Sequence, residues 1–117
     1  MLKFLKKIQI RSFETGLLFV HGEFDRLLDA GRHWLFDPLR KKSVEIVSRR
    51  APWIVHDQLD VIVKSGALEG RADWIDLKDH QRALVWIDGR FDRFLSPGLH
   101  AWWTDLKDVQ VEVIDAR

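Results

Sequence analysis

The chain of 117 residues has no cysteine, so neither a disulfide framework nor thiolate chemistry is available to it. It has no apolar run near the roughly 18 residues that a membrane-spanning helix needs. Its first residues, MLKFLKKIQI, are basic and only partly apolar, and they lack the apolar core and cleavage site of a secretory signal. We therefore expect a cytoplasmic protein, or one at the cytosolic face of a membrane, with no signal peptide or transmembrane segment in this chain.

Catalytic motifs are lacking as well. The sequence contains no GxSxG, P-loop, GxGxxG or HExxH pattern, and its glycines stand singly at expected turns. No two of the five histidines have the helical spacing that would bring them to one metal ion: His21, His33, His56, His80 and His100. We expect no enzyme activity, no catalytic, cofactor-binding or metal-binding residues, no cofactor and no small-molecule substrate.

The net charge is small but unevenly placed. The whole chain carries +1, whereas residues 1–50 hold 11 Lys/Arg against 6 Asp/Glu and residues 51–117 hold 8 against 12. Halves of opposite sign can attract one another within a chain or between neighbouring chains. A nucleic-acid binder would present one broad basic face, so we expect no nucleic-acid partner.

What the chain does contain is an internal repeat. HGEFDRLLDAGRH at 21–33 is echoed by DGRFDRFLSPGLH at 88–100, and a shift of 67 positions aligns residues 10–50 with 77–117 without a gap. Twelve of the 41 aligned pairs are identical. A match of this length indicates a duplication.

Each copy has the pattern of β-structure. Two apolar-rich runs flank His21-Gly22 in the first copy and Asp88-Gly89 in the second, a pair typical of tight hairpins whose turn residues have positive φ. Alternating valines and isoleucines near the end of each copy predict a third strand. We predict a mainly β fold of two duplicated hairpin-plus-strand units, 10–50 and 77–117, that share one core with pseudo-two-fold character.

The connector between the copies differs in character. Asp57 as N-cap, Leu59, Ile62 and Val63 on one side, and Gly66 as a stop favour a short helix near 57–65. The same stretch also alternates as a strand would, and RADWIDL at 71–77 predicts a strand that leads into the second copy. We expect a single β-rich domain over 1–117, made of repeat 1 (8–50), the connector (51–76) and repeat 2 (77–117).

The repeated histidines, His33 and His100, follow the second turn glycine of each copy. The duplicated fold could bring them together, but an imidazole that donates to a nearby carbonyl in its own turn is the favoured interpretation. The neighbouring Asp-Arg pairs, at 25–26 and 92–93, predict exposed cross-strand ion pairs. The predicted turn residues are Gly22, Gly31, Gly89, Gly98, His33 and His100.

Six tryptophans in so short a chain predict an exposed apolar patch. Trp86 falls in an alternating hairpin strand and is expected in the core, whereas adjacent tryptophans in an extended chain point to opposite faces, which leaves one of Trp102 and Trp103 exposed. The basic clusters at 3–7, 40–42 and 49–50 could contact anionic lipid headgroups. The predicted interaction surface comprises Trp34, Trp102, Trp103, Arg40, Lys41 and Lys42.

Both copies also carry a family resemblance. FETGLLFVHGEFDRLLDAGRHWLFDPL and HQRALVWIDGRFDRFLSPGLHAWW resemble the opening of bacterial slipin (stomatin-like) proteins of the stomatin–prohibitin–flotillin (SPFH, Band 7) superfamily, and VEIVSRR and VEVIDAR resemble the strand that follows there. The resemblance covers residues 8–117 and implies the N-terminal tandem region of a longer protein. The membrane-inserting hairpin and the long charged helix of that superfamily are not in this sequence.

Together these features predict a non-catalytic scaffold or assembly module. Its partner would be a second copy of the chain, as a homo-oligomer, or another protein near a membrane, with peripheral contact to anionic lipid. One alternative is a β-domain that binds a small ligand or an oligosaccharide through exposed tryptophans. A weaker alternative is binding of single-stranded nucleic acid by stacking.

Overall fold

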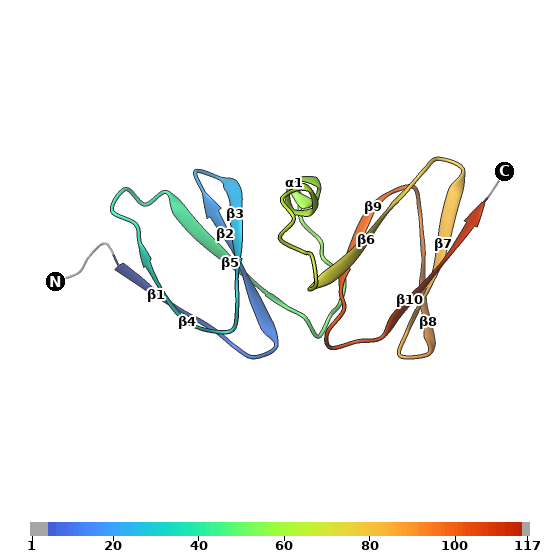
Figure 1. The fold of residues 1–117 in the computed structure, drawn as a ribbon, viewed down its shortest axis with the longest axis horizontal. Helices are drawn as coiled ribbons and strands as arrows, with labels where there is room; N and C mark the ends of the chain where they lie inside the picture. Colours follow the sequence, from blue (N-terminus) through green and yellow to red (C-terminus); the bar gives the residue numbers. More distant parts are fainter. Residues whose placement is uncertain (1–4, 116–117) are drawn as a thin grey trace. The chain divides into compact units, whose positions relative to one another are not determined.

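The computed structural model describes residues 5–115, which form ten β-strands and one short helix (Figure 1). The chain divides into two compact units, residues 1–49 and residues 50–117. Among the described residues no helix is long and apolar enough to cross a membrane.

The first unit consists of two small antiparallel sheets. One pairs β1 with β4, and the other has the strand order β3-β2-β5. Its strands are β1 (Leu5–Ile10), β2 (Glu14–Val20), β3 (Glu23–Leu28), β4 (Gly31–Phe36) and β5 (Lys42–Ser48). Both sheets contribute to one buried apolar cluster, which contains Ile10, Leu18, Leu28 and Leu35.

The second unit repeats this plan strand for strand, 67 positions later. It pairs β6 with β9 and has a three-stranded sheet in the order β10-β7-β8. Its strands are β6 (Ala72–Leu77), β7 (Gln81–Ile87), β8 (Arg90–Leu95), β9 (Gly98–Trp103) and β10 (Val109–Asp115). The corresponding apolar cluster contains Leu77, Ala83, Val85 and Leu95.

The predicted mainly β class, the duplicated units and the short helix are confirmed. Each unit has five strands, however, whereas the sequence predicted a hairpin plus one strand in each copy and, before the second copy, the strand at 71–77 that is confirmed as β6. β1 was missed because its two lysines are exposed and only Ile10 is buried, so LKKIQI has the appearance of a basic tail. It becomes a strand through its register with β4, from Leu5 opposite Phe36 to Ile10 opposite Gly31. A core shared by both repeats stays a prediction, and residues 116–117 of the second repeat lie outside the described range.

The hairpin turns have the geometry that their sequences predict. His21 and Gly22 have φ values of 53° and 77°, and Asp88 and Gly89 have 51° and 81°. Two successive positive φ angles are the mark of a type I′ turn, whose twist matches that of the flanking strands. The same two-residue turn therefore fixes the hairpin in both units.

A β-bulge follows each hairpin turn. In the first unit Leu18 pairs with Arg26 but Phe19 pairs with Phe24, which leaves Asp25 as the extra residue, and Asp92 has the same place in the second unit. The bulge breaks the alternation of side chains. Each aspartate consequently pairs with the arginine beside it, at 3.2 Å in the first unit and 2.6 Å in the second. The prediction of cross-strand pairs was wrong for this reason.

The helix α1 (Leu59–Lys64) lies in the segment that joins the repeats. The side chain of Ile62 in this helix is fully buried. Gly66, with a φ of 80°, follows the end of the helix as predicted. The predicted N-cap, Asp57, was wrong, because the N-cap is Gln58 and makes no side-chain capping hydrogen bond. The backbone N–H of Gln58 instead donates to Nδ1 of His56 at 2.9 Å.

Gly16 in β2 offers a test of the duplicated core, because Ala83 has its place in β7. A Cβ atom on Gly16 would lie 2.7 Å from Cδ1 of Ile10, whose counterpart in the second unit is Leu77. We expect Gly16→Ala to lower the free energy of unfolding by about 1–3 kcal/mol through overpacking. Adding Ile10→Leu, which restores the pairing of the second unit, should recover most of this loss.

Urea unfolding of the single and double variants measures these effects. Ile10→Leu alone is the matched control and should change stability little, because the exchange conserves side-chain volume. A Gly16→Ala variant as stable as the wild type, or a double variant no better than the single one, would contradict the equivalence of the two cores.

Candidate interaction surface

The outer edge of β9 is closed by the chain segment that precedes the second repeat. The N–H of Trp103 donates to the carbonyl of Pro52 at 2.7 Å, and the N–H of Ile54 donates to the carbonyl of Ala101 at 2.9 Å. Trp53 lies opposite Trp102 in an antiparallel bridge, and their rings pack edge to face with centroids 5.9 Å apart. Residues 52–54 therefore act as a third strand beside β6 and β9.

This cover buries the adjacent tryptophans. Trp102 is 6% exposed and Trp103 is 2% exposed, and α1 lies against β9 with Ile62 and the nearby Leu68 fully buried. The prediction that Trp102 and Trp103 belong to an interaction surface was wrong, because each face of β9 is covered. Trp86, which was expected in the core, is half-buried.

In the first unit, the equivalent strand β4 has no such cover among the described residues. It pairs with β1 and with no further described strand. Trp34 corresponds to Ala101 and is 63% exposed, and Phe36 corresponds to Trp103 and is 55% exposed. Leu35, between them, points to the core and is buried. Among the described residues no strand pairs with the outer side of β4 and Trp34 stays mostly exposed, whereas the equivalent side of β9 is closed.

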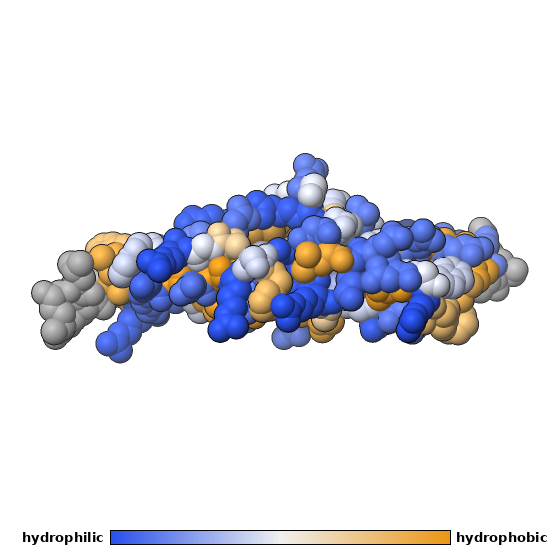
Figure 2. Space-filling view, turned by 90° about the horizontal axis from the view of Figure 1, so that it is seen from below, coloured by the Kyte–Doolittle hydropathy of each residue, from blue (hydrophilic) through white to orange (hydrophobic). Residues whose placement is uncertain are grey.

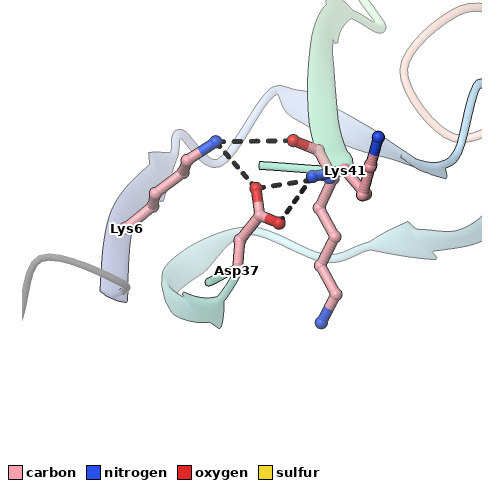
Figure 3. Close-up of polar contacts among 4 residues, drawn as sticks. Lys6, Asp37 and Lys41 are labelled. Atoms are coloured by element: carbon pink, nitrogen blue, oxygen red, sulfur yellow. Dashed lines mark hydrogen bonds and ion pairs between the residues drawn. The ribbon is translucent and has the colours of Figure 1, made fainter. Parts of the chain in front are cut away.

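The loop after β4 is organised by a buried carboxylate, that of Asp37 (Figure 3). Its oxygens accept the backbone N–H groups of Lys41 at 2.7 Å and Lys42 at 3.2 Å. The ammonium of Lys6 lies 3.0 Å from the same carboxylate and also reaches the carbonyl of Lys42. Burial alone would raise the pKa of Asp37, but the hydrogen bonds from Lys6, Lys41 and Lys42 outweigh it and hold the pKa below its ordinary value.

This loop presents positive charge beside the exposed aromatic face. Arg40, with a φ of 55°, and Lys41 are exposed, as is Leu39 at 73%, whereas Lys42 is half-buried at the start of β5. The structure thus brings Trp34, Arg40 and Lys41 of the predicted surface together on one unit. We call Trp34, Phe36 and residues 39–41 the β4 surface.

The repeated histidines anchor their own turns. Nε2 of His33 lies 2.7 Å from the carbonyl oxygen of Asp29, and Nε2 of His100 lies 2.8 Å from that of Ser96. Each carbonyl comes four residues earlier, on the far side of a glycine with positive φ. These contacts agree with the turn-anchoring interpretation. Within residues 5–115 no three His, Asp or Glu side chains gather as a metal site would require.

The second unit has an open hollow of about 410 Å³ beside the closing segment, lined by residues that include Trp53, His56, Phe94 and His100. The guanidinium of Arg93 lies 4.5 Å from the centre of the Trp53 ring, and the indole N–H of Trp53 donates to Asp92 at 3.1 Å. These contacts hold the Trp53 ring at the wall of the hollow.

An exposed aromatic cluster on β8 was not predicted. Phe91 and Phe94 are 51% and 68% exposed, and Phe91 packs edge to face against both Trp86 and Phe94. Figure 2 shows exposed apolar side chains as separate patches between hydrophilic ones. The sequence did not indicate this cluster because the bulge at Asp92 breaks the alternation of inward and outward side chains from which exposure on a strand is inferred.

No protein-family model, curated protein or solved structure matches the chain. The structure of each unit is therefore compared with that of the other. The two units differ at the outer edge and face of β4 and β9.

The carboxylate of Asp37 makes the stability of the first unit depend on pH. Because its pKa is lowered in the folded state, its contribution is present above the unfolded value of about 4 and is lost as the pH falls through the lowered folded value. We expect Asp37→Asn to be less stable than the wild type at neutral pH and the difference to shrink in acid. Urea unfolding at a series of pH values measures it.

Asp25→Asn, which removes an exposed carboxylate of the same unit, is the control and should cost less at neutral pH. A constant difference between wild type and Asp37→Asn across the acid range would show that the charge of Asp37 does not hold the loop.

Proposed function

We propose that this chain is a non-catalytic assembly module of a stomatin-like protein, which associates with copies of itself near a membrane. One observation carries the proposal. The strand edge that residues 52–54 close in the second unit has no pairing strand among the described residues of the first unit, where Trp34 is 63% exposed. Exposed edges with apolar neighbours are the usual sites of strand pairing between chains.

The distribution of charge supports a contact between unlike units. Residues 1–49 hold 10 Lys/Arg against 6 Asp/Glu, and residues 50–117 hold 9 against 12. A basic unit that meets the acidic unit of the next copy gives a head-to-tail contact, which closes into a ring or continues as a filament. The exposed basic side chains of the β4 surface strengthen this attraction at low salt.

Contact with anionic lipid is part of the proposal. Lys7 is exposed on β1, and Arg40 and Lys41 are exposed after β4, all in the first unit. Clusters of Lys and Arg attract anionic headgroups. The sequence also offers Leu2, Phe4 and Leu5 as apolar contacts with the lipid interface; Leu2 and Phe4 lie outside the described residues, and Leu5 is half-buried at the start of β1.

A second candidate function is binding of an oligosaccharide or another small ligand in the hollow of the second unit. The observation that favours it is the Trp53 ring, which lies at the wall beside His56 and His100. Aromatic rings at the wall of a hollow are common in such sites. Quenching of tryptophan fluorescence by an oligosaccharide, abolished by Trp53→Phe, would support this function over assembly.

Self-association should depend on salt. At about 0.01 M salt, where charges act over about 30 Å, we expect concentration-dependent oligomers, and at about 1 M, where the range is about 3 Å, we expect mainly monomers. Sedimentation velocity at several protein concentrations measures both states.

Arg40→Glu combined with Lys41→Glu should weaken association at low salt, and Lys64→Glu with Lys78→Glu in the second unit is the control of equal charge change. A monomer under every condition would contradict the proposed assembly. Oligomers that are insensitive to salt would contradict its electrostatic basis.

A further inference from the structure

We propose that the outer edge of β4 in one copy accepts strand β10 of a second copy, so that the two chains share an extended sheet. The inference rests on the proposed self-association and names the two surfaces that make it. It follows from the comparison of the two units and from the charge and exposure of the strands that pair with one described strand only.

In the second unit, the edge of β9 that corresponds to the outer edge of β4 pairs with residues 52–54. On β9, the carbonyl of Ala101 and the N–H of Trp103 point away from β6 and bond to Ile54 and Pro52. Because the registers of β1 with β4 and of β6 with β9 correspond position by position, the backbone of Trp34 points away from β1 in the same way. An added strand would meet the outward backbone of Trp34 as Ile54 meets the carbonyl of Ala101.

The side chains on β4 differ from those on β9 in a way that suits a partner from another chain. On β9 the position that corresponds to Trp34 is taken by Ala101, which is 1% exposed, and α1 lies against that strand within the same unit. Trp34 replaces it with a large indole that is mostly exposed. Buried indoles contribute strongly to interfaces between proteins, and an added strand would cover this one.

The best-matched donor is β10, an edge strand in the order β10-β7-β8. Its exposed aliphatic side chains are Val113 and Ile114, at 43% and 39% exposure. Its charged residues, Glu112 and Asp115, are both acidic, whereas Arg32 is the charged residue of β4. β4 has 6 residues and β10 has 7, so the strands also agree in length.

The other edge strands fit less well. β8 carries Arg90 and Arg93 against Asp92 alone, so its net charge is positive, like that of the β4 surface. β6 is acidic, but Trp74 is its one large apolar side chain above a third exposed, and β3 and β5 belong to the basic unit itself. The pairing of β4 with β10 joins unlike units, which makes the contact head-to-tail.

The test uses one variant that blocks each surface. Trp34→Glu places a negative charge on the acceptor surface, where it would repel the acidic β10, and Ile114→Lys places a positive charge on the donor strand, where it would repel the basic β4 surface. In sedimentation velocity at low salt, we expect each variant alone to associate about tenfold or more weakly than the wild type. An equimolar mixture should form a one-to-one dimer and nothing larger, because each variant keeps the surface that the other has lost.

Phe94→Glu and Phe94→Lys are the matched controls for the two charges, since Phe94 is an aromatic residue on β8 that is 68% exposed, close to the exposure of Trp34. Both should associate as the wild type does. Recovery of a dimer in the mixture also proves that both blocking variants are folded.

The outcomes separate the two proposals. If the wild type fails to associate at low salt, the proposed function itself is wrong. If the wild type associates and either blocking variant does so equally well, the pairing of β4 with β10 is overturned while self-association stands. A mixture that remains monomeric while both single variants are folded overturns the pairing as well.

Discussion

The feature on which the rest depends is the pairing of residues 52–54 with the outer edge of β9. Two backbone hydrogen bonds, from Trp103 to Pro52 and from Ile54 to Ala101, complete a three-stranded arrangement in the second unit. This pairing places Trp53 against Trp102 and, with α1, buries Trp103. The first unit has the same strand in β4 without this cover among the described residues. The two copies of the fold therefore differ through one short segment, residues 52–54.

Much of what the two units share is local geometry. Both have a type I′ turn, a bulge at the aspartate and a histidine bonded to the carbonyl four residues earlier. Each of these three features restrains the backbone where the chain reverses. A hairpin can therefore keep all three while the side chains on the faces of its strands change. The faces have diverged, with Trp34 in place of Ala101 and Asp37 in place of Thr104. The shared features are architectural, and the differences make the β4 surface.

The sequence was informative where structure is decided within a few residues. Turn glycines predicted positive φ, and the periodicity of 59–63 predicted α1. It failed where distant segments decide the outcome. The exposure of Trp102 and Trp103 cannot be inferred from their alternation, because residues 52–54 and α1 cover both faces of the strand. Likewise, β1 is a strand through its pairing with β4, and its own residues, rich in lysine, do not show this.

Amide hydrogen exchange of β4 compared with β9 tests the account most directly. In dilute protein at high salt, the amide of Trp34 should exchange rapidly, because its outward-facing N–H meets solvent, whereas those of Trp103 and Ile54 should be protected by their bonds across the closed edge. In concentrated protein at low salt, the amide of Trp34 should become protected and the other two should be unchanged. Protection of Trp34 already in the dilute protein, or exchange that concentration does not slow, would contradict an open edge that closes on assembly.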